Sequence, residues 1–339
     1  MDFRVFYVLL STVLPCYSEG CHIYSDKSCS YTLSCVGSFT SNDAESAFEP
    51  YMYSYPYGNY YDEECTTFVE YEQNKFYHVY LVLLLNNSNK TMLIPNTLDS
   101  ISEERLNIIY SLDISLNNYT ESPVIRSMQN LAIIIFSYNY LTTAVLTNDN
   151  ELAMLTEINF SHNKINEIKL KSHQHLPKKL TKIDLSYNKL ENIPDNIFEK
   201  FEHLQTLDFS NNNIEIISQF AFKGLTKLSN LNLSNNKIRS IHSYLFKDTS
   251  ISLISFTENK LEDLLASGMF EGLKVSMLDL SNQSLTGVKD YAFQDLVKLN
   301  TLLLNANNIY SLSNMCFKTL LNLKHLDLSK NQIISIDFN

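Results

Sequence analysis

Apolar residues in this chain recur in a short phrase that returns about every two dozen residues. In one clear copy, Leu180, Ile183 and Leu185 are set between polar residues, and Asn188 closes the phrase. Alternation of apolar and polar residues predicts a short strand with one buried and one exposed face. The pattern therefore predicts a series of similar short strands, one in each copy of the phrase.

The asparagine that closes each phrase forms the second regular feature. A buried side-chain amide has to bond backbone groups of its own coil and of the neighbouring coil. We therefore expect these residues, the ladder asparagines, to hold successive coils together, with Gln283 taking the place once. They are Asn117, Asn139, Asn163, Asn188, Asn212, Asn236, Asn259, Asn307 and Asn331.

A phenylalanine follows most phrases at a constant distance, with Phe270 one residue later, and we expect these rings to fill the side of the coil opposite the strands. They are Phe198, Phe222, Phe246, Phe270, Phe293 and Phe317. One such coil buries too few apolar side chains to offset the entropy of ordering its backbone, so the coils have to stack.

The complete phrase, Leu-x-x-Leu-x-Leu-x-x-Asn-x-Leu, resembles the leucine-rich repeat family. The irregular first coils and the asparagine-rich phrases resemble animal extracellular members, including Toll-type receptor ectodomains and the secreted immune leucine-rich repeat proteins of insects. The resemblance implies an α/β-type solenoid, a horseshoe of about ten to eleven repeats with a parallel β-sheet on its concave face.

The start of the chain predicts export. Residues 1–20 combine Arg4, an apolar run over 5–14 and small residues near Ser18, which is typical of a secretory signal peptide, with an uncleaved anchor as the alternative. After them, no stretch reaches the roughly 18 apolar residues that a membrane helix needs. We therefore expect a protein that is secreted or lies on the extracellular face of the plasma membrane, with no membrane span in this sequence.

The next segment, 21–75, is expected to form an amino-terminal cap with an acidic, tyrosine-rich loop. The resemblance implies a disulfide-bonded cap, and four cysteines allow three pairings, which stay open. A zinc site is the weaker alternative, because these cysteines lack a paired Cys-x-x-Cys. They are Cys21, Cys29, Cys35 and Cys65.

The repeats are expected over 76–339, irregular to about 125 and regular over 126–339. Cys316 replaces a small residue before Phe317 and is expected to be a buried free thiol, with an intermolecular disulfide as the alternative. No cysteine cluster follows the last phrase, so a carboxy-terminal cap is not expected in this sequence. This departure from the family favours a fragment, a partner covering the end, or a continuation into a stalk or anchor.

Six Asn-x-Ser/Thr sequons fit the same compartment and predict N-linked glycans. They are Asn86, Asn89, Asn118, Asn159, Asn232 and Asn282.

Chemistry and charge narrow the possible functions. The chain contains no nucleophile elbow, zinc-binding helix or phosphate-binding glycine loop, so we expect no enzyme, no cofactor and no metal. His173 and His175 lie in a lysine-rich insertion without a nearby third ligand, and a solvated loop is the expected reading. The net charge of −11 argues against nucleic acid as the main partner.

Candidate binding residues are the apolar exceptions on the outward face of the predicted strands, because that face should otherwise be polar. One candidate patch consists of Ile133, Ile135 and Tyr138. The favoured patch consists of Leu253, Met277 and Leu303, with Glu258 and Asp279 on its rim. A glycan on Asn159 would obstruct the first patch.

The sequence therefore predicts a recognition protein that binds another protein, or a glycan, microbial or matrix ligand, through its concave face. A role in innate immunity is what the resemblance implies. The alternatives are an adhesion or matrix protein that forms homo- or heterodimers, and a non-catalytic regulatory subunit of a secreted enzyme.

Overall fold

The computed structural model describes residues 20–25, 30–36, 80–84, 109–122, 125, 128–146, 152–170, 176–261 and 265–334. Several features predicted from the sequence lie outside these ranges. They are the signal peptide up to residue 19, most of the cap with Cys29 and Cys65, the sequons at Asn86 and Asn89, and the insertion with His173 and His175.

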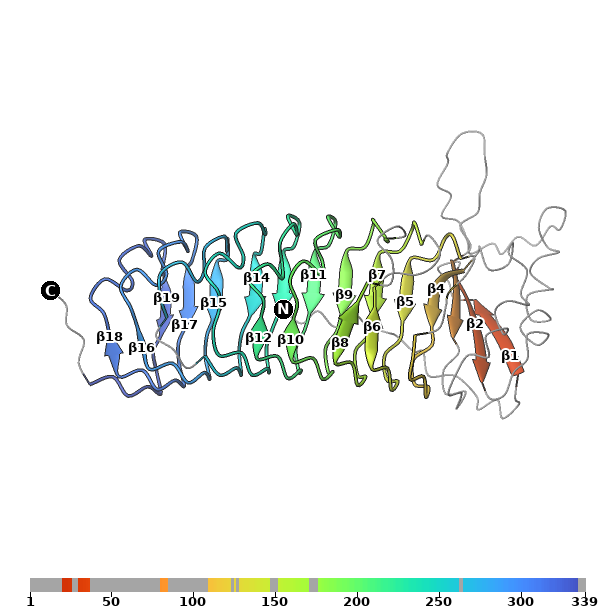
Figure 1. Cartoon of the computed structure of the whole chain (residues 1–339), viewed down its shortest axis with the longest axis horizontal. Coiled ribbons are helices and arrows are strands. Elements are labelled where there is room, and N and C mark those ends of the chain that lie inside the picture. Colours follow the sequence, from red (N-terminus) through yellow and green to blue (C-terminus); the bar gives the residue numbers. More distant parts are fainter. Residues whose placement is uncertain are drawn as a thin grey trace, which may run out of the picture.

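The described residues form a solenoid whose coils stack in one elongated row (Figure 1). Each coil contributes one strand to a 13-stranded sheet, in which β1 and β2 are antiparallel and the following strands run parallel. In order across the sheet, the strands are β1 (Gly20–Ser25), β2 (Ser30–Val36), β3 (Tyr80–Leu84), β4 (Ile109–Asp113), β5 (Ile133–Ile135), β7 (Glu157–Asn159), β9 (Lys182–Asp184), β11 (Thr206–Asp208), β13 (Asn230–Asn232), β14 (Leu253–Ser255), β15 (Met277–Asp279), β17 (Thr301–Leu303) and β19 (His325–Asp327). From β4 onward these are the strands that the repeated phrase predicts, whereas β1, β2 and β3 precede the first copy of the phrase.

A second set of short strands follows the ladder asparagines and pairs between neighbouring coils. The pairs are β6 (Thr143–Val145) with β8 (Glu167–Lys169), β10 (Asn192–Ile193) with β12 (Ile216–Ile217), and β16 (Gly287–Val288) with β18 (Ser311–Leu312). The rest of each coil consists of turns, and the described residues include no α-helix. The phrase did not predict these strands, because two or three residues are too few to show a period.

The register of the main sheet places equivalent residues of successive coils side by side. Leu207 in the middle of β11 lies between Ile183 and Leu231, and all three are buried. Strand side chains alternate between faces, so both flanking residues of each strand point outward. The outward residues of β9 and β11 are half-buried, as this alternation requires.

The predicted phenylalanines pack inside the coils, opposite the strands. Phe222 stacks on Phe246 with ring centroids 6.1 Å apart, and Phe293 lies 5.8 Å from Phe270 and 6.0 Å from Phe317. All except Phe317 are fully buried. Stacked rings therefore join neighbouring coils in two runs, Phe222 with Phe246 and Phe270 with Phe293 and Phe317.

The ladder asparagines from Asn139 to Asn307 are buried and bond two coils at once, as predicted, and half-buried Asn331 makes the same contacts. The Asn212 amide Nδ2 donates to the carbonyls of Leu185, Phe209 and Ser210 at 2.9, 3.0 and 3.2 Å. Its Oδ1 accepts a hydrogen bond from the backbone N–H of Leu190 in the preceding coil at 3.0 Å. One side chain thus satisfies backbone groups that lie on both coils.

Gln283 fills the ladder position with a longer side chain. Its Nε2 donates to the Phe256 carbonyl in the preceding coil and to the Ser281 carbonyl of its own coil. Its Oε1 accepts from the Leu261 N–H at 3.4 Å, longer than the 3.0 Å at Asn212. The ladder therefore continues through this coil with weaker geometry.

The first two strands bear on the cysteine pairing in the cap. In the antiparallel pair of β1 and β2, Cys21 lies directly opposite Cys35. Residues opposite each other in such a pair have Cα atoms about 4.5–5.5 Å apart, within the range that a disulfide needs. The backbone register therefore places two of the four cap cysteines at adjacent positions on neighbouring strands.

We expect two cap disulfides and a reduced Cys316 in the mature protein. Cys316 is a free thiol, 2% exposed, and burial raises its pKa to about 11, which disfavours the reactive thiolate. Peptide mapping under non-reducing conditions should recover the four cap cysteines in two bridges and Cys316 alone. A bridge to Cys316, or four reduced cap cysteines, would contradict this assignment.

Candidate binding surface

Three parallel rows of side chains cover the outer face of the sheet. The first row and the middle row come from the two ends of each strand, and the third row from the turn before each ladder asparagine. The first row runs Ile133, Glu157, Lys182, Thr206, Asn230, Leu253, Met277, Thr301 and His325. The middle row runs Asp113, Ile135, Asn159, Asp184, Asp208, Asn232, Ser255, Asp279, Leu303 and Asp327. The third row runs Leu116, Tyr138, His162, Tyr187, Asn211, Asn235, Glu258, Asn282, Ala306 and Lys330, all with positive φ.

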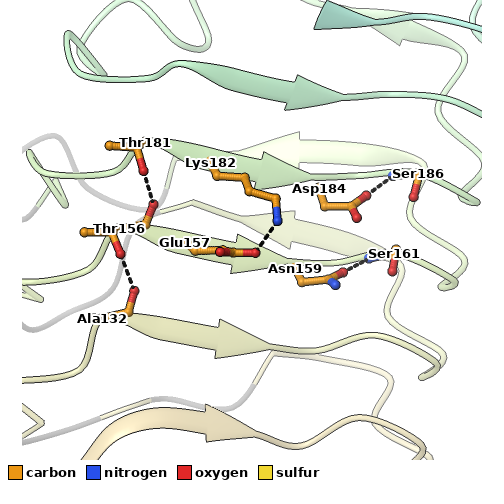
Figure 2. A network of polar contacts seen from close by, with 9 residues as sticks. All are labelled: Ala132, Thr156, Glu157, Asn159, Ser161, Thr181, Lys182, Asp184 and Ser186. Carbon is orange, nitrogen blue, oxygen red and sulfur yellow. Dashed lines mark hydrogen bonds and ion pairs between the residues drawn. The ribbon is translucent and has the colours of Figure 1, made fainter. Parts of the chain in front are cut away.

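Most aspartates of the middle row support the turn that follows their own strand. Asp184 Oδ1 accepts a hydrogen bond from the Ser186 N–H at 2.9 Å, and Asn159 Oδ1 accepts one from Ser161 at 2.8 Å (Figure 2). Aspartate and asparagine make the same contact, so the negative charge is not needed for it. The same contact recurs from coil to coil, so these aspartates serve the structure of the repeat.

The charge on Asp184 opposes folding. Burial is the main cause that raises the pKa of this carboxyl, and the neighbouring Asp208 adds to it, against the hydrogen bonds from Ser186 and the charge of Lys182. A group whose pKa is raised by folding contributes stability below its unfolded pKa and loses it as the pH rises through the folded pKa. At neutral pH the sheet therefore holds a carboxylate whose charge does not stabilise it.

An ion pair bridges the first row between β7 and β9. Lys182 Nζ lies 2.5 Å from Glu157 Oε1, and both side chains are partly exposed (Figure 2). Beside it, Thr156 Oγ1 donates to the Ala132 carbonyl at 3.1 Å and Thr181 Oγ1 to the Thr156 carbonyl at 3.0 Å. These hydrogen bonds link neighbouring coils at the start of the strands. The exposed ion pair itself adds little to the stability of the fold.

The structure extends the amino-terminal candidate patch. Ile133 and Ile135 are half-buried on the outer face of β5, next to Glu157 and Asn159. Tyr138 is 51% exposed, and its ring stacks on His162 at 4.2 Å.

The stack continues from His162 to Tyr187 at 4.1 Å, and the three rings are nearly parallel. Burial lowers the pKa of His162, with Asp184 acting in the opposite direction. Sequence reasoning missed His162 and Tyr187, although each precedes a ladder asparagine as Tyr138 does. Because His162 has a tyrosine ring on both faces, a planar ligand has no place between these rings.

The favoured carboxy-terminal patch points away from the core, as its register predicts. Leu253 is 59% exposed and Met277 45%, and they lie in the same row on neighbouring strands. Leu303 is half-buried in the middle row, where it neighbours Asp279, and it sits diagonally from Met277. Asp279 thus lies within the surface beside Leu303, while exposed Glu258 lies at its third-row edge.

Other exposed apolar side chains lie outside the sheet. Phe220 and Tyr244 are 49% and 53% exposed, in the turns that carry the buried Phe222 and Phe246. The Tyr244 ring is partly covered by Lys247, whose Nζ lies 5.5 Å from the ring centroid. This pair provides a natural comparison for the patch on the sheet.

Among the described residues, no group of three or more His, Cys, Asp or Glu side chains is placed to hold a metal ion. No helix in the same ranges is long and apolar enough to cross a membrane.

Comparisons with known proteins agree with the solenoid. The family model described as leucine rich repeat matches residues 178–238 and 274–333. No curated protein sequence matches the chain significantly.

Several solved structures share the fold at low sequence identity. TLR13, solved as a complex with ssRNA13, is 23% identical with a TM-score of 0.57, and the match covers 77% of this chain and 40% of that one. The leucine-rich repeat domain of APL1B is 19% identical with a TM-score of 0.55, covering 76% and 68%. Toll in its complex with Spatzle, from Drosophila, is 20% identical with a TM-score of 0.54, covering 74% and 36%. The chain therefore spans well under half of the TLR13 and Toll chains that it matches.

Proposed function

We propose that this chain, which is a leucine-rich repeat protein with a recognition role, is secreted or displayed on the cell surface and binds another protein through the outer face of its sheet. The observation that carries the proposal is the pair Leu253 and Met277, which present apolar side chains on a face built mainly from polar residues. In the proposed domain organisation, residues 1–20 form a signal peptide, 21–75 a cap and 76–339 the repeats.

The physical argument rests on how protein interfaces gain their energy. A few apolar anchors inside a polar surround supply most of it. Leu253 and Met277 lie on the neighbouring strands β14 and β15, with Leu303 diagonal to Met277 and Asp279 adjoining Leu303. Neighbouring strands are about 4.8 Å apart, so the three side chains form one contiguous surface for a partner residue.

The charge of the same face favours a protein over a nucleic acid. Asp184 and Asp208 are neighbours in the middle row, and Asp279 lies three coils further on. Lys182, the first-row basic residue next to them, is already paired with Glu157. Phosphate groups would be repelled by such a row. A protein partner, in contrast, can set its own basic side chains against it.

The extracellular location is supported by the kinds of protein that share the fold, together with the apolar start of the chain and its sequons. A role in immune recognition follows the same likeness and belongs to the proposal.

Expression of the full chain in animal cells should deliver it to the medium, where glycosidase treatment lowers its apparent mass, because the signal peptide exposes its sequons to the glycosylation machinery. A matched chain lacking residues 2–20 should stay in the cytosol at its polypeptide mass. Recovery of the complete, unglycosylated full-length chain in the cytosol would contradict the proposed location.

The secreted protein can then be screened against an array of cell-surface and secreted ectodomains. We expect at least one ectodomain to bind reversibly, and a Leu253→Asp variant to lose that signal while it still folds. A partner that binds both proteins equally would remove this face from the proposed function.

A further inference from the structure

We propose that Asn282 carries an N-linked glycan on the edge of the binding surface, while the sequons at Asn159 and Asn232 on the same face stay unmodified. This inference rests on the proposed secretory location. It distinguishes sequons that are equivalent in the sequence, because the structure gives their side chains different surroundings.

Asn282 has the surroundings that a glycan needs. It is exposed in the turn that follows β15, with φ of 54°, and its backbone N–H donates to the Asn305 carbonyl at 3.1 Å. Within the described part of the chain, no hydrogen bond involves its side-chain amide. Its neighbours in the third row are Glu258 and Ala306, and the small Ala306 leaves room on one side.

The other asparagines of the third row, unlike Asn282, have hydrogen-bonded side-chain amides. Asn235 Nδ2 donates to Asn211 Oδ1 at 2.6 Å, so these two amides occupy each other. Asn282 has no asparagine next to it in the row, and its amide nitrogen therefore remains open to solvent.

Both the nitrogen and the oxygen of the Asn232 side-chain amide make hydrogen bonds. Its Nδ2 donates to Asp208 Oδ2 at 3.1 Å, and its Oδ1 accepts from the Ser234 N–H and hydroxyl at 3.1 and 2.7 Å. It is half-buried between Asp208 and Ser255 on the neighbouring strands. The side-chain nitrogen that would carry the sugar and the hydroxyl of the sequon are therefore both engaged in hydrogen bonds of the folded protein.

Asn159 is similarly enclosed. It is half-buried between Ile135 and Asp184, and its Oδ1 accepts from the Ser161 N–H at 2.8 Å. Ser161, which supplies the sequon hydroxyl, is only 6% exposed. A sugar on this nitrogen would have to rise between strands that are about 4.8 Å apart.

The chemistry of the transfer makes these differences matter. The oligosaccharide comes from a lipid-linked diphosphate donor: a bond forms between sugar C1 and asparagine Nδ2, the C1–O bond to the diphosphate breaks, and Nδ2 loses one proton. The modified nitrogen keeps a single N–H and carries a bulky polar group. Whenever the transfer takes place, the folded protein has to accommodate this product. Among these three sequons, Asn282 leaves space for it without disturbing a sheet contact, and Asn159 and Asn232 do not.

A glycan on Asn282 would border the favoured patch on one side. Asn282 belongs to the same coil as Met277 and adjoins Glu258 in the third row. Leu253 and Met277 lie in the first row, at the opposite end of the strands. The glycan therefore directs a partner to approach over the first row, and an unmodified Asn159 leaves Ile133 and Ile135 uncovered.

Peptide mass spectrometry of the full chain secreted from animal cells tests the inference. Enzymatic removal of N-glycans in heavy-oxygen water converts each modified asparagine to a labelled aspartate. We expect label at Asn282 and none at Asn159 or Asn232. Label at Asn86 or Asn89 with none at Asn282 would overturn the inference while the secretory location stands, and label at Asn159 or Asn232 would overturn its second half. A secreted chain without any label would contradict the glycosylation on which both proposals rely.

Two serine variants supply a matched control. Ser284→Ala destroys the sequon of Asn282 and should lower the mass of the secreted protein by one glycan, as Asn282→Gln should. Ser234→Ala destroys the sequon of Asn232 and should leave the glycan mass unchanged. The opposite result for the two serines would reverse the assignment.

Discussion

Replacement of Asn212 by Leu should destabilise the folded protein by about 3 kcal/mol, most of it from one buried backbone group. The three carbonyls that Asn212 bonds each keep a second donor: Leu185 from Asn188, Phe209 from Asn236 and Ser210 from Tyr187. The Leu190 N–H loses Asn212 Oδ1 and is left buried without an acceptor. Such an orphaned donor costs about 1–3 kcal/mol, to which the lost second bonds add.

Asn213→Leu is the matched control, because Asn213 follows directly, is half-buried, and makes no side-chain hydrogen bond within the described residues. It should cost less than about 0.5 kcal/mol. Asn211 would be a poor control, since its φ is 57° and its side chain pairs with Asn235. Denaturant unfolding of the two variants measures the difference. Equal losses would mean that the ladder does not hold the coils together.

Gly272→Ala should be the other strongly destabilising change, with a loss of about 3 kcal/mol or more. Gly272 has φ of 96°, and a Cβ added there would lie 2.2 Å from the Phe246 carbonyl oxygen and 2.5 Å from the Lys247 Cα. These are backbone atoms of the preceding coil, so the two coils would have to separate to admit a methyl group.

Gly268→Ala in the same turn isolates the backbone term. Its φ of 83° is also unfavourable for alanine, but the added Cβ would meet only the Ser243 side chain at 3.6 Å. We expect a loss of about 1 kcal/mol from φ alone. If thermal unfolding shifts equally in both variants, the close approach of the two coils at Gly272 is wrong.

The repeated phrase predicted the sheet well because it combines two requirements in each copy. Ile183 and Leu185 have to face inward, and Asn188 has to bond both coils, so one register satisfies every copy at once. Gln283 fitted the same place because its longer side chain still reaches Phe256 in the preceding coil.

Contacts between coils in the third row were harder to predict. The stack of Tyr138, His162 and Tyr187 joins residues that are far apart in sequence, and left-handed backbone there favours Gly or Asn, not tyrosine. These residues are recognised as one row only when the repeated phrases are aligned and the residues at the equivalent position of each phrase are compared. The same holds for Asn282, whose open amide depends on Glu258 and Ala306 in the coils on either side.

The candidate binding residues were partly predictable. Alternation along each strand predicted that Leu253 and Met277 face outward, because the residue that follows each of them in its strand faces the core. The position of these side chains relative to Leu303 was harder to predict. The strand register sets Leu303 beside Asp279 and diagonal to Met277, and no pattern within a single phrase contains that information.

The most direct test of recognition through the sheet compares two exposed apolar pairs in one binding experiment. One variant carries Leu253→Asp and Met277→Asp, and the other carries Phe220→Asp and Tyr244→Asp outside the sheet. Affinity for the ectodomain identified on the array is measured for both, with the melting temperature as a check on folding. We expect the sheet pair to weaken binding at least about tenfold, or about 1.4 kcal/mol, and the other pair to bind as the unaltered protein does. Unchanged affinity of the sheet variant, or a loss confined to the Phe220 and Tyr244 variant, would contradict the account.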